Sequence, residues 1–566
     1  MRELIREMVS FVKCRIYIAA VGFIALCSYG FAITHYSIGK DDTAVSLYFE
    51  DGVAPLAGRW CLFVMNKVFH IHIGDFAPWM VELVSVLIFI LSVTLWCVLW
   101  KRVCEPRVVL PLWNYLFVAG IFISCPLISE VFIYYLHNGV CTGYGVTALS
   151  LLCLLESFSL KNNRAQSVRY IFGASLLLTV AIGFYESFAI VYILGGVMAF
   201  FLLRLLYGKA DAGIKYSLKV FPWIRNGFLT GLVSILLRSM ILTVLKAAYD
   251  LQRFEIYNVQ YRNIFADTFK PEEGLAMNIK RFYVMYYVHA FVYLPITILV
   301  LAIIVIGIFS LYYGIRKKDI MLPLCSMAIV LFPVLMSMLE SIIAGVPTQY
   351  RSSQYVPLIG AFAVLLLLIK LKQNGAAKWL SVCCCLFFSV IIYDQCADMN
   401  RWFYLDYLKY RDTAEVMDNV AYDLKAGYDI SKPIVFRGAY RVPYSISKDA
   451  YCSFDSPQYR WICRFTDPID PHLKEKYFAE NGRGYVFTEM PISSTLQWGI
   501  TAFDGTAGQL IEFWNMHGHS SFRCETDPVL MEEAEQIRTG EGMPGYPTEG
   551  YIKECDNYII VNLDSY

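Results

Sequence analysis

The sequence predicts a polytopic α-helical membrane protein, with about eleven transmembrane helices and a C-terminal α/β domain. The prediction rests on composition, on long apolar runs and on a change in charge density along the chain. Of the 566 residues, 57% are hydrophobic and 17% are charged, whereas soluble globular proteins have roughly 45–50% and about 25%. This composition excludes an ordinary soluble enzyme and a disordered chain. The formal net charge of +1 excludes nucleic-acid binding through a globally basic surface.

The first apolar run, residues 16–34, is interpreted as a retained transmembrane helix. Basic residues precede it, as in a signal peptide, but it is long for the apolar part of a signal peptide and has no small-x-small cleavage site. Ten further runs are apolar enough to cross a hydrocarbon core of about 30 Å. These runs are predicted at residues 79–100, 108–128, 139–158, 168–185, 187–207, 221–246, 284–313, 320–339, 355–371 and 378–394.

The basic side chains indicate the direction of the spans. Lysine and arginine cluster after alternate spans, for example at Lys101–Arg102 and Arg316–Lys318, and every cluster falls on the same side as the N-terminus. Cytoplasmic loops of membrane proteins carry such an excess of positive charge. The sequence therefore predicts a multi-pass protein of the cytoplasmic (inner) membrane with its N-terminus in the cytoplasm. An odd number of spans places the C-terminal part outside.

Charge is sparse up to about residue 394 and dense afterwards, which divides the chain into a transmembrane domain, 1–394, and an extracytoplasmic soluble α/β domain, 395–566. In the second domain the patterns predict an amphipathic helix at 412–426, a polar helix at 528–538, and short buried strands at 433–436, 485–488 and 558–561. Its cysteines, Cys452, Cys463, Cys524 and Cys555, would allow one or two disulfides outside the cell, but their pairing cannot be read from sequence.

An acidic pair, Asp41-Asp42, follows the first span on the predicted outer side. Adjacent carboxylates repel each other, and a pair of this kind suits a general base or a metal ligand. The alternative is a helix cap, because Asp42-Thr43 precedes an amphipathic stretch and Asp is a good N-cap residue. The two interpretations are compatible, since a capping Asp can have a functional neighbour.

Three arginines on or near the outer side are candidates for binding a phosphate. Arg59 follows Gly58 at the start of a second amphipathic stretch, Arg238 lies inside a span, and Arg351 lies in a loop before the tenth span. Arginine binds phosphate bidentately, and a charge within a span usually has a partner. The alternatives are an interfacial anchor for Arg59, snorkelling to the headgroups for Arg238 and an ordinary loop cation for Arg351.

Further polar residues on the same side are candidates for the lining of a pocket. They are Tyr185, Glu186, Glu130 and Glu340. His137 lies on the same side, but a histidine in such a place has a structural role more often than a catalytic one. In the C-terminal domain, Trp461, Trp498 and Trp514 are candidates for stacking on sugar rings, with core packing as the more common role of such residues.

Several known motifs are absent. The sequence has no Walker loop, HExxH or GxSxG, and no GxGxxG in a βαβ context, which argues against nucleotide-driven transport and dinucleotide chemistry. No CxxC pairs with a second CxxC or with two histidines, which argues against a structural zinc site.

The acidic pair Asp41-Asp42, the Gly58-Arg59 dipeptide before an amphipathic helix, Tyr185-Glu186 and Arg351 together resemble the polytopic glucosyltransferases of the serotype-converting O-antigen (Gtr) type, within the GT-C class. The tail Met543–Pro547 also resembles relatives with an extracytoplasmic C-terminal domain. The resemblance covers mainly residues 1–394. Two positions depart from the family pattern: Val45 stands where Arg is frequent, and Glu186 stands where Gln is common.

The resemblance implies a membrane enzyme that transfers a sugar, expected to be glucose, from a polyprenyl-phosphate donor. The acceptor would be a cell-surface polysaccharide or a lipid-linked glycan on the outer face of the membrane. Asp41 or Asp42 would deprotonate the acceptor hydroxyl, and Arg59, Arg238 or Arg351 would stabilise the departing phosphate. No cofactor is expected, because a monophosphate leaving group makes Mg²⁺ or Mn²⁺ less necessary, although two carboxylates could hold such an ion.

Three classes of rival remain open. A flippase or transporter for a lipid-linked glycan would need charged or broken helices near the midplane and often internal repeats, and no clear repeat is evident. A polysaccharide polymerase or ligase would use a diphosphate-linked donor. A receptor or scaffold is less compatible with so many spans.

Overall fold

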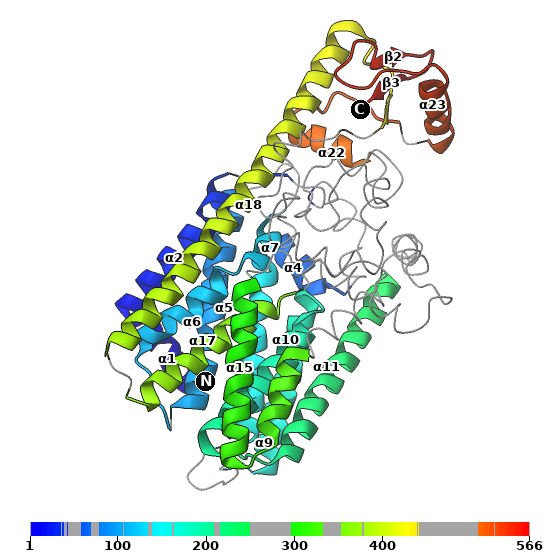
Figure 1. The fold of residues 1–566 in the computed structure, drawn as a ribbon. Coiled ribbons are helices and arrows are strands. Elements are labelled where there is room, and N and C mark those ends of the chain that lie inside the picture. Colours follow the sequence, from blue (N-terminus) through cyan, green and yellow to red (C-terminus); the bar gives the residue numbers. More distant parts are fainter. Residues whose placement is uncertain are drawn as a thin grey trace, which may run out of the picture.

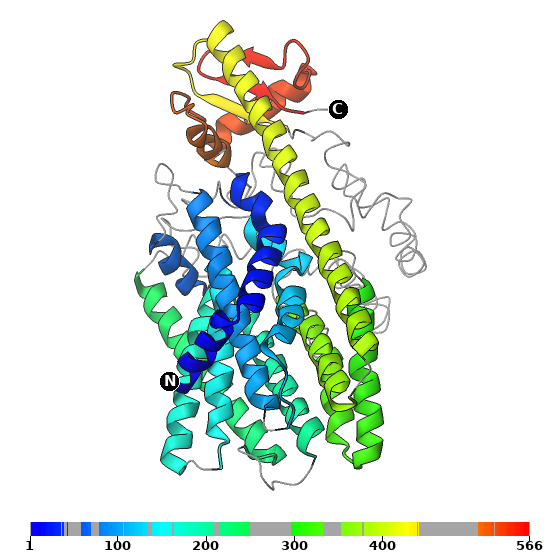
Figure 2. The same cartoon turned by 90° about the vertical axis from the view of Figure 1, so that its left-hand side faces the viewer.

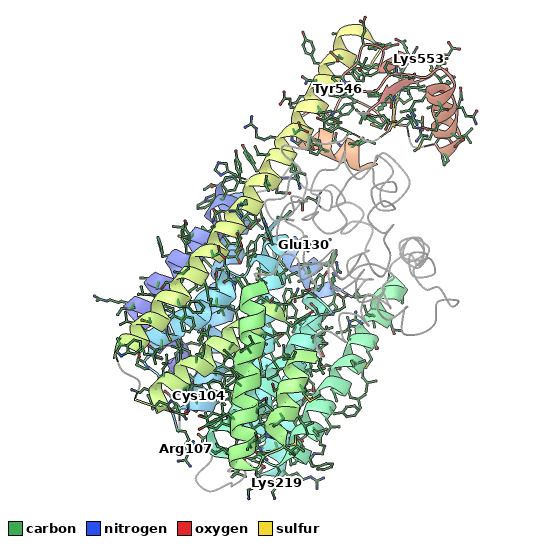
Figure 3. All side chains as sticks on the ribbon, in the orientation of Figure 1. Cys104, Arg107, Glu130, Lys219, Tyr546 and Lys553 are labelled. Atoms are coloured by element: carbon green, nitrogen blue, oxygen red, sulfur yellow. The ribbon has the colours of Figure 1, made fainter. Side chains whose placement is uncertain are left out.

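The computed structural model describes residues 2–35, 37–38, 42, 58–68, 78–105, 107–133, 139–160, 163–208, 216–248, 296–331, 353–375, 378–438, 440, 508–525 and 527–564. These residues form a bundle of long helices and, beyond one end of it, a small sheet with its own helices (Figure 1). We call the end of the bundle nearer this sheet the upper end and the other the lower end. Figure 3 labels Cys104, Arg107 and Lys219 at the lower end and Glu130 towards the upper end.

The bundle consists of long helices joined by shorter ones. In chain order they are α1 (Arg2–Lys13), α2 (Arg15–Thr34), α4 (Trp60–Val68), α5 (Pro78–Cys104), η3 (Leu112–Asn114), α6 (Tyr115–Ile123), η4 (Pro126–Ile128), α7 (Ser129–Ile133), α8 (Cys141–Ser157), α9 (Arg164–Phe184), α10 (Phe188–Tyr207), α11 (Val220–Ala248), α15 (Ile296–Lys317), an apolar helix Met321–Leu331, α17 (Val356–Gln373) and α18 (Lys378–Gly427). Each of the eleven predicted apolar runs overlaps one or more of these helices.

Seven helices among the described residues are long and apolar enough to cross a membrane, and an eighth is obtained if one bent pair is a single span. The bent pair joins Leu112–Ile123 to Pro126–Ile133 at an angle of 53°. Pro126 explains the break, because proline cannot continue the hydrogen bonding of the preceding helix. The mostly helical fold is thus compatible with a polytopic membrane protein. The number of about eleven spans stays a prediction.

Ion pairs between helices hold the lower end together. Arg204 of α10 donates to Asp319 at 2.7 Å, and both side chains are buried. Arg102 of α5 donates to Glu7 of α1 at 2.6 Å and lies 3.5 Å from Glu156 of α8. Buried charges require such partners, because desolvation without compensation is costly. Basic residues end α5, α10, α15 and α17 at this same end.

Helix α18 is one continuous helix of 50 residues that runs along the bundle and continues upward to the sheet (Figures 1 and 2). It contains no proline, and its first glycine is Gly427 at its end. At 1.5 Å per residue it is about 75 Å long, about two and a half times the thickness of a hydrocarbon core. The division of the chain at residue 394 stays a prediction, and α18 passes through that position without a break.

The small sheet has the strand order β1-β3-β2. Strand β1 (Ile434–Arg437) pairs in parallel with β3 (Ile559–Asn562), and β2 (Ile552–Glu554) pairs with β3 in the antiparallel sense. Strands β1 and β3 and helix α23 (Pro528–Gly540) fall where the sequence predicts two strands and a polar helix. The strand predicted at 485–488 lies outside the described residues.

Alternation of side chains along the strands gives the sheet two cores. Ile434, Phe436, Ile559 and Val561 face the end of α18 and helix α22 (Gly508–Met516). Val435 and Ile560 face α23 on the other side, where they meet Met531 and Ala534. Successive strand residues point to opposite faces, so the two helical layers cover one sheet. Cys524 and Cys555 are free thiols here, while Cys452 and Cys463 lie outside the described residues.

Candidate functional site

Three segments that are far apart in the sequence meet at the upper end of the bundle. Glu186, in the turn between α9 and α10, lies between two arginines: its Oε2 is 3.6 Å from Nε of Arg59, and its Oε1 is 3.6 Å from Nη2 of Arg238. The guanidinium of Arg59 also lies over the ring of Tyr185, 4.3 Å from its centroid. This cation–π contact orients the planar guanidinium. We call these four side chains the arginine cluster.

The positions of the arginines follow from the helices that carry them. Arg59 immediately precedes α4, whose first residues pack on the end of α9. That packing requires Gly183, because a Cβ there would lie 2.7 Å from Trp60 and 2.8 Å from Cys61. Arg238 lies on α11, about 27 Å above the start of that helix at 1.5 Å per residue, and therefore close to the level where α9 ends.

Taken by themselves, the four side chains of the arginine cluster carry an excess of positive charge, and Arg59 and Tyr185 have further partners as well. Two guanidinium groups and one carboxylate sum to +1, and the side chains of Arg59, Glu186 and Arg238 are 18%, 36% and 26% exposed. At 3.6 Å the ion pairs are longer than ordinary hydrogen bonds. A group of this kind attracts an anion, and guanidinium donors match the geometry of a phosphate.

An apolar groove of about 540 Å³ runs down the bundle below the cluster, between α9, α10, α11 and the helix Met321–Leu331. Its lining ends one helical turn from each part of the cluster: Ile182 is three residues before Tyr185, Ala189 is three after Glu186, and Ile235 is three before Arg238. The lining residues are Leu154, Leu178, Ile182, Ala189, Tyr192, Ile193, Gly196, Val197, Phe200, Val220, Trp223, Ile224, Gly227, Phe228, Gly231, Leu232, Ile235, Met321, Leu324, Cys325 and Ala328.

The groove opens to the side of the bundle. Ile224, Phe228 and Ile235 of α11 line it and are 65%, 67% and 59% exposed. Gly227 and Gly231 widen the groove. Both line it, and a Cβ at either position would project into open space, with no other atom within 4 Å. Along α11 the lining extends from Val220 to Ile235, about 22 Å. An apolar chain entering from the side could therefore extend to within about one helical turn of the arginine cluster.

The other predicted site residues fall in two groups. Asp42 and Glu130 are buried, 2% and 4% exposed, and both have interaction partners. Neither is a member of the two ion pairs of the arginine cluster. Glu130 lies on α7, towards the upper end of the bundle (Figure 3).

The remaining candidates lie outside the described residues. They are Asp41, His137, Glu340 and Arg351, together with Trp461 and Trp498. Trp514 is 1% exposed and donates to the carbonyl of Met417, so it belongs to the core.

Two buried polar residues at this end were missed by the sequence reasoning. Glu82 of α5 is 1% exposed and has an interaction partner. Gln354, just before α17, is 1% exposed. Its backbone carbonyl accepts a hydrogen bond of 2.8 Å from the hydroxyl of Tyr144 on α8. An acid within the apolar run 79–100 was a usable signal for Glu82, because ionisable residues in spans are usually functional. Nothing local distinguishes Gln354.

Within the described ranges, no three His, Cys, Asp or Glu side chains come together as a metal-binding group. The side chains that the structure brings together are arginine, tyrosine and a single glutamate. Their chemistry is that of anion binding and electrostatic stabilisation, which needs no ligand exchange.

These features describe a mostly helical protein that is compatible with a polytopic membrane protein, with an arginine cluster one helical turn beyond the lining of an apolar groove. Comparison with protein families identifies it further: residues 30–368 match the model of the family glucosyl transferase GtrII, which is well over half of the chain. The chain belongs to this family and is a glucosyltransferase, which confirms the resemblance found in the sequence. Searches of curated proteins and of solved structures gave no significant match.

Proposed function

We propose that this protein transfers glucose from a polyprenyl-phosphate donor to a surface polysaccharide or lipid-linked glycan at the outer face of the cytoplasmic membrane. The observation that carries the proposal is the apolar groove that opens to the side of the bundle and whose lining stops one helical turn from the arginine cluster. An isoprenoid tail is apolar and its phosphate is anionic, so one molecule would satisfy both parts of the site. A nucleotide sugar would leave the groove without an occupant.

The outer-face assignment is supported by the charge distribution. The basic last turns of α5, α10, α15 and α17 lie at the lower end, opposite the arginine cluster and Glu130. By the positive-inside rule the lower end would face the cytoplasm. The cluster, Asp42 and the C-terminal sheet would then lie on the outer side.

The reaction would be a single displacement. Asp41 or Asp42 takes the proton of an acceptor hydroxyl, whose oxygen forms a bond to the anomeric carbon of glucose. The bond from that carbon to the phosphate oxygen breaks, and polyprenyl phosphate leaves with the electron pair. Arg59 and Arg238, together with Arg351, would stabilise the negative charge that accumulates on the leaving phosphate.

The test uses the purified full chain in lipid nanodiscs, with polyprenyl-phosphate glucose, polyprenyl-diphosphate glucose and a nucleotide glucose as alternative donors. We expect transfer from the monophosphate donor only. Transfer from the diphosphate donor would indicate a polymerase or ligase, and movement of the glycan across the membrane without transfer would indicate a flippase.

Variants then locate the chemistry. Arg238→Gln should lower the rate of transfer by about 10²- to 10³-fold, as expected for the loss of one donor to a developing oxyanion. Arg225→Gln is the matched control, because Arg225 lies on the same helix towards its lower end and donates to Asn226. Asp41→Asn and Asp42→Asn are compared directly, and wild-type rates in both would remove the proposed base.

A further inference from the structure

The segment that leads to Asp41-Asp42 is attached to the C-terminal domain. Ser37 donates a hydrogen bond of 2.5 Å from its hydroxyl to Oδ2 of Asp406 on α18, and the two residues are 9% and 5% exposed. Ile38 is 4% exposed and belongs to the hydrophobic core of the C-terminal sheet, together with Tyr410 and Val420 of α18 and Ile434 of β1. A residue four positions before Asp42 is therefore a core residue of a domain formed by the other end of the chain.

The contact continues along the whole upper part of α2. Ser28 lies 3.2 Å from the sulfur of Cys396, and Asn400 donates to the carbonyl of Cys27. Higher up, the ring of Phe31 lies edge-on to Tyr404 and Tyr407, with 5.9 Å between centroids in each case. Figure 2 shows the upper part of α2 beside α18. Helix α2 and the segment that follows it are thus joined side by side to the helix that carries the C-terminal sheet.

The short distance along the chain makes this attachment consequential. Asp41 and Asp42 follow Ile38 by three and four residues, and an extended chain covers at most about 3.6 Å per residue. Asp42 is therefore confined to within about 14 Å of Ile38, which belongs to the core of the C-terminal sheet. Because a displacement of about 1 Å at a reacting group can cost about 10²-fold in rate, small shifts of this attachment would be felt in catalysis.

We propose that Ser37, Ile38 and Asp406 are positioning residues, through which the C-terminal domain sets the position of the acidic pair Asp41-Asp42. The inference rests on the proposed function, in which that pair acts on the acceptor hydroxyl. The C-terminal domain would then contribute to catalysis by positioning the acidic pair, in addition to being attached to the membrane helices.

The test compares Ser37→Ala, Asp406→Ala and the double variant with a matched control, Tyr551→Phe. The control removes the hydrogen bond of 2.6 Å from the Tyr551 hydroxyl to Asp423. Asp423 also lies on α18, so the control perturbs the same helix and the same domain but not residues 37–38. Ser37→Thr keeps a hydroxyl and serves as the rescue variant.

We expect Ser37→Ala and Asp406→Ala each to lower kcat by about 10- to 100-fold, while donor binding stays within twofold of wild type because the donor is held by the arginine cluster. The double variant should be no slower than the slower single variant, since both changes remove the same hydrogen bond between Ser37 and Asp406. Ser37→Thr should recover most of the rate, and Tyr551→Phe should keep it. Equal losses in Ser37→Ala and Tyr551→Phe, or additive losses in the double variant, would overturn the inference.

A second measurement does not depend on activity. Hydrogen exchange of the peptide containing residues 37–45 should be faster in Ser37→Ala than in wild type and unchanged in Tyr551→Phe. Unchanged exchange in Ser37→Ala would contradict the attachment. If the wild-type protein transfers no glucose from polyprenyl phosphate, the proposed function fails, whereas normal transfer by Ser37→Ala would refute the positioning role alone.

Discussion

Gly58 provides the space that the side chain of Arg238 occupies. A Cβ at position 58 would lie 2.2 Å from Nη2 of Arg238 and 3.0 Å from its Cζ, and Gly58 has a φ of +94°. Both the backbone conformation and the contact therefore require glycine. The Gly58-Arg59 dipeptide thus contributes two features to the site: Arg59 itself, and a surface against which the second arginine lies.

Replacing Gly58 by alanine should displace Arg238 from Glu186. We expect transfer to fall by at least about 10-fold, because Arg238 would no longer reach the phosphate. Gly208→Ala is the control, since Gly208 also has a positive φ of +76° but has nothing within 4 Å of a Cβ. Both variants bear a backbone cost, on the order of 1–3 kcal/mol, and only Gly58→Ala should lose activity. Similar rates in both would show that the contact is unimportant.

Replacing Glu186 by glutamine should strengthen anion binding. The carboxylate competes with a bound phosphate for the two guanidinium groups, and its neutralisation raises the net charge of the cluster. We expect several-fold tighter binding of polyprenyl phosphate, with a steeper dependence on ionic strength, measured by native mass spectrometry or by tryptophan fluorescence in nanodiscs. Glu105→Gln at the lower end should change neither property. Weaker binding in Glu186→Gln would mean that Glu186 contacts the ligand favourably.

Filling the groove should prevent the donor from binding without disturbing the fold. Gly231→Leu places an apolar side chain into the groove, where a Cβ meets no neighbour. Gly173→Leu on α9 also meets no neighbour but is not part of the lining. We expect Gly231→Leu to raise KM for a long-chain donor by about 10-fold or more and to affect a short-chain analogue less, while Gly173→Leu resembles wild type. An equal effect on long and short donors would argue against a tail in the groove.

The stability of the C-terminal domain should decrease at acidic pH. A hydrogen bond from Arg538 at 2.6 Å, with nearby positive charge, lowers the pKa of Glu535 below its ordinary value. Since the pKa is depressed in the folded state, the stabilisation is present above the unfolded pKa and is lost as pH falls through the folded value. Glu535→Gln should therefore exchange faster than wild type at pH 7 in peptides of α23, and the two proteins should converge well below pH 4. A constant difference across this range would refute the pH dependence.

Removing divalent metal should leave transfer unchanged. The described cluster can neutralise a leaving monophosphate through its arginines, which is the role that a metal ion would otherwise fill. Treatment with EDTA followed by assay in metal-free buffer checks this, with readdition of Mg²⁺ or Mn²⁺ as the control. Loss of activity that either ion restores would indicate that Asp41 and Asp42 hold a metal.

Much of the fold could be predicted because its signals are local. Each apolar run is long enough to be recognised by itself, and α2, α5, α10 and α11 lie where the runs predict them. Arg59, Tyr185-Glu186 and Arg238 could be selected individually, since a charge in or near a span is costly and requires a reason. The strands β1 and β3 could be predicted from short runs of hydrophobic residues.

The sequence by itself determined the class of the protein, the positions of its helices and the residue types available for chemistry, because hydropathy and charge act residue by residue. Only the tertiary structure decided that Glu186 bridges Arg59 and Arg238, that Gly227 and Gly231 widen one groove, and that Ser37 binds α18 while Ile38 joins the core of the C-terminal sheet. Those relationships join positions between about 50 and 370 residues apart in the sequence. They depend on which helix faces pack together, and packing of that kind leaves no local pattern in the chain.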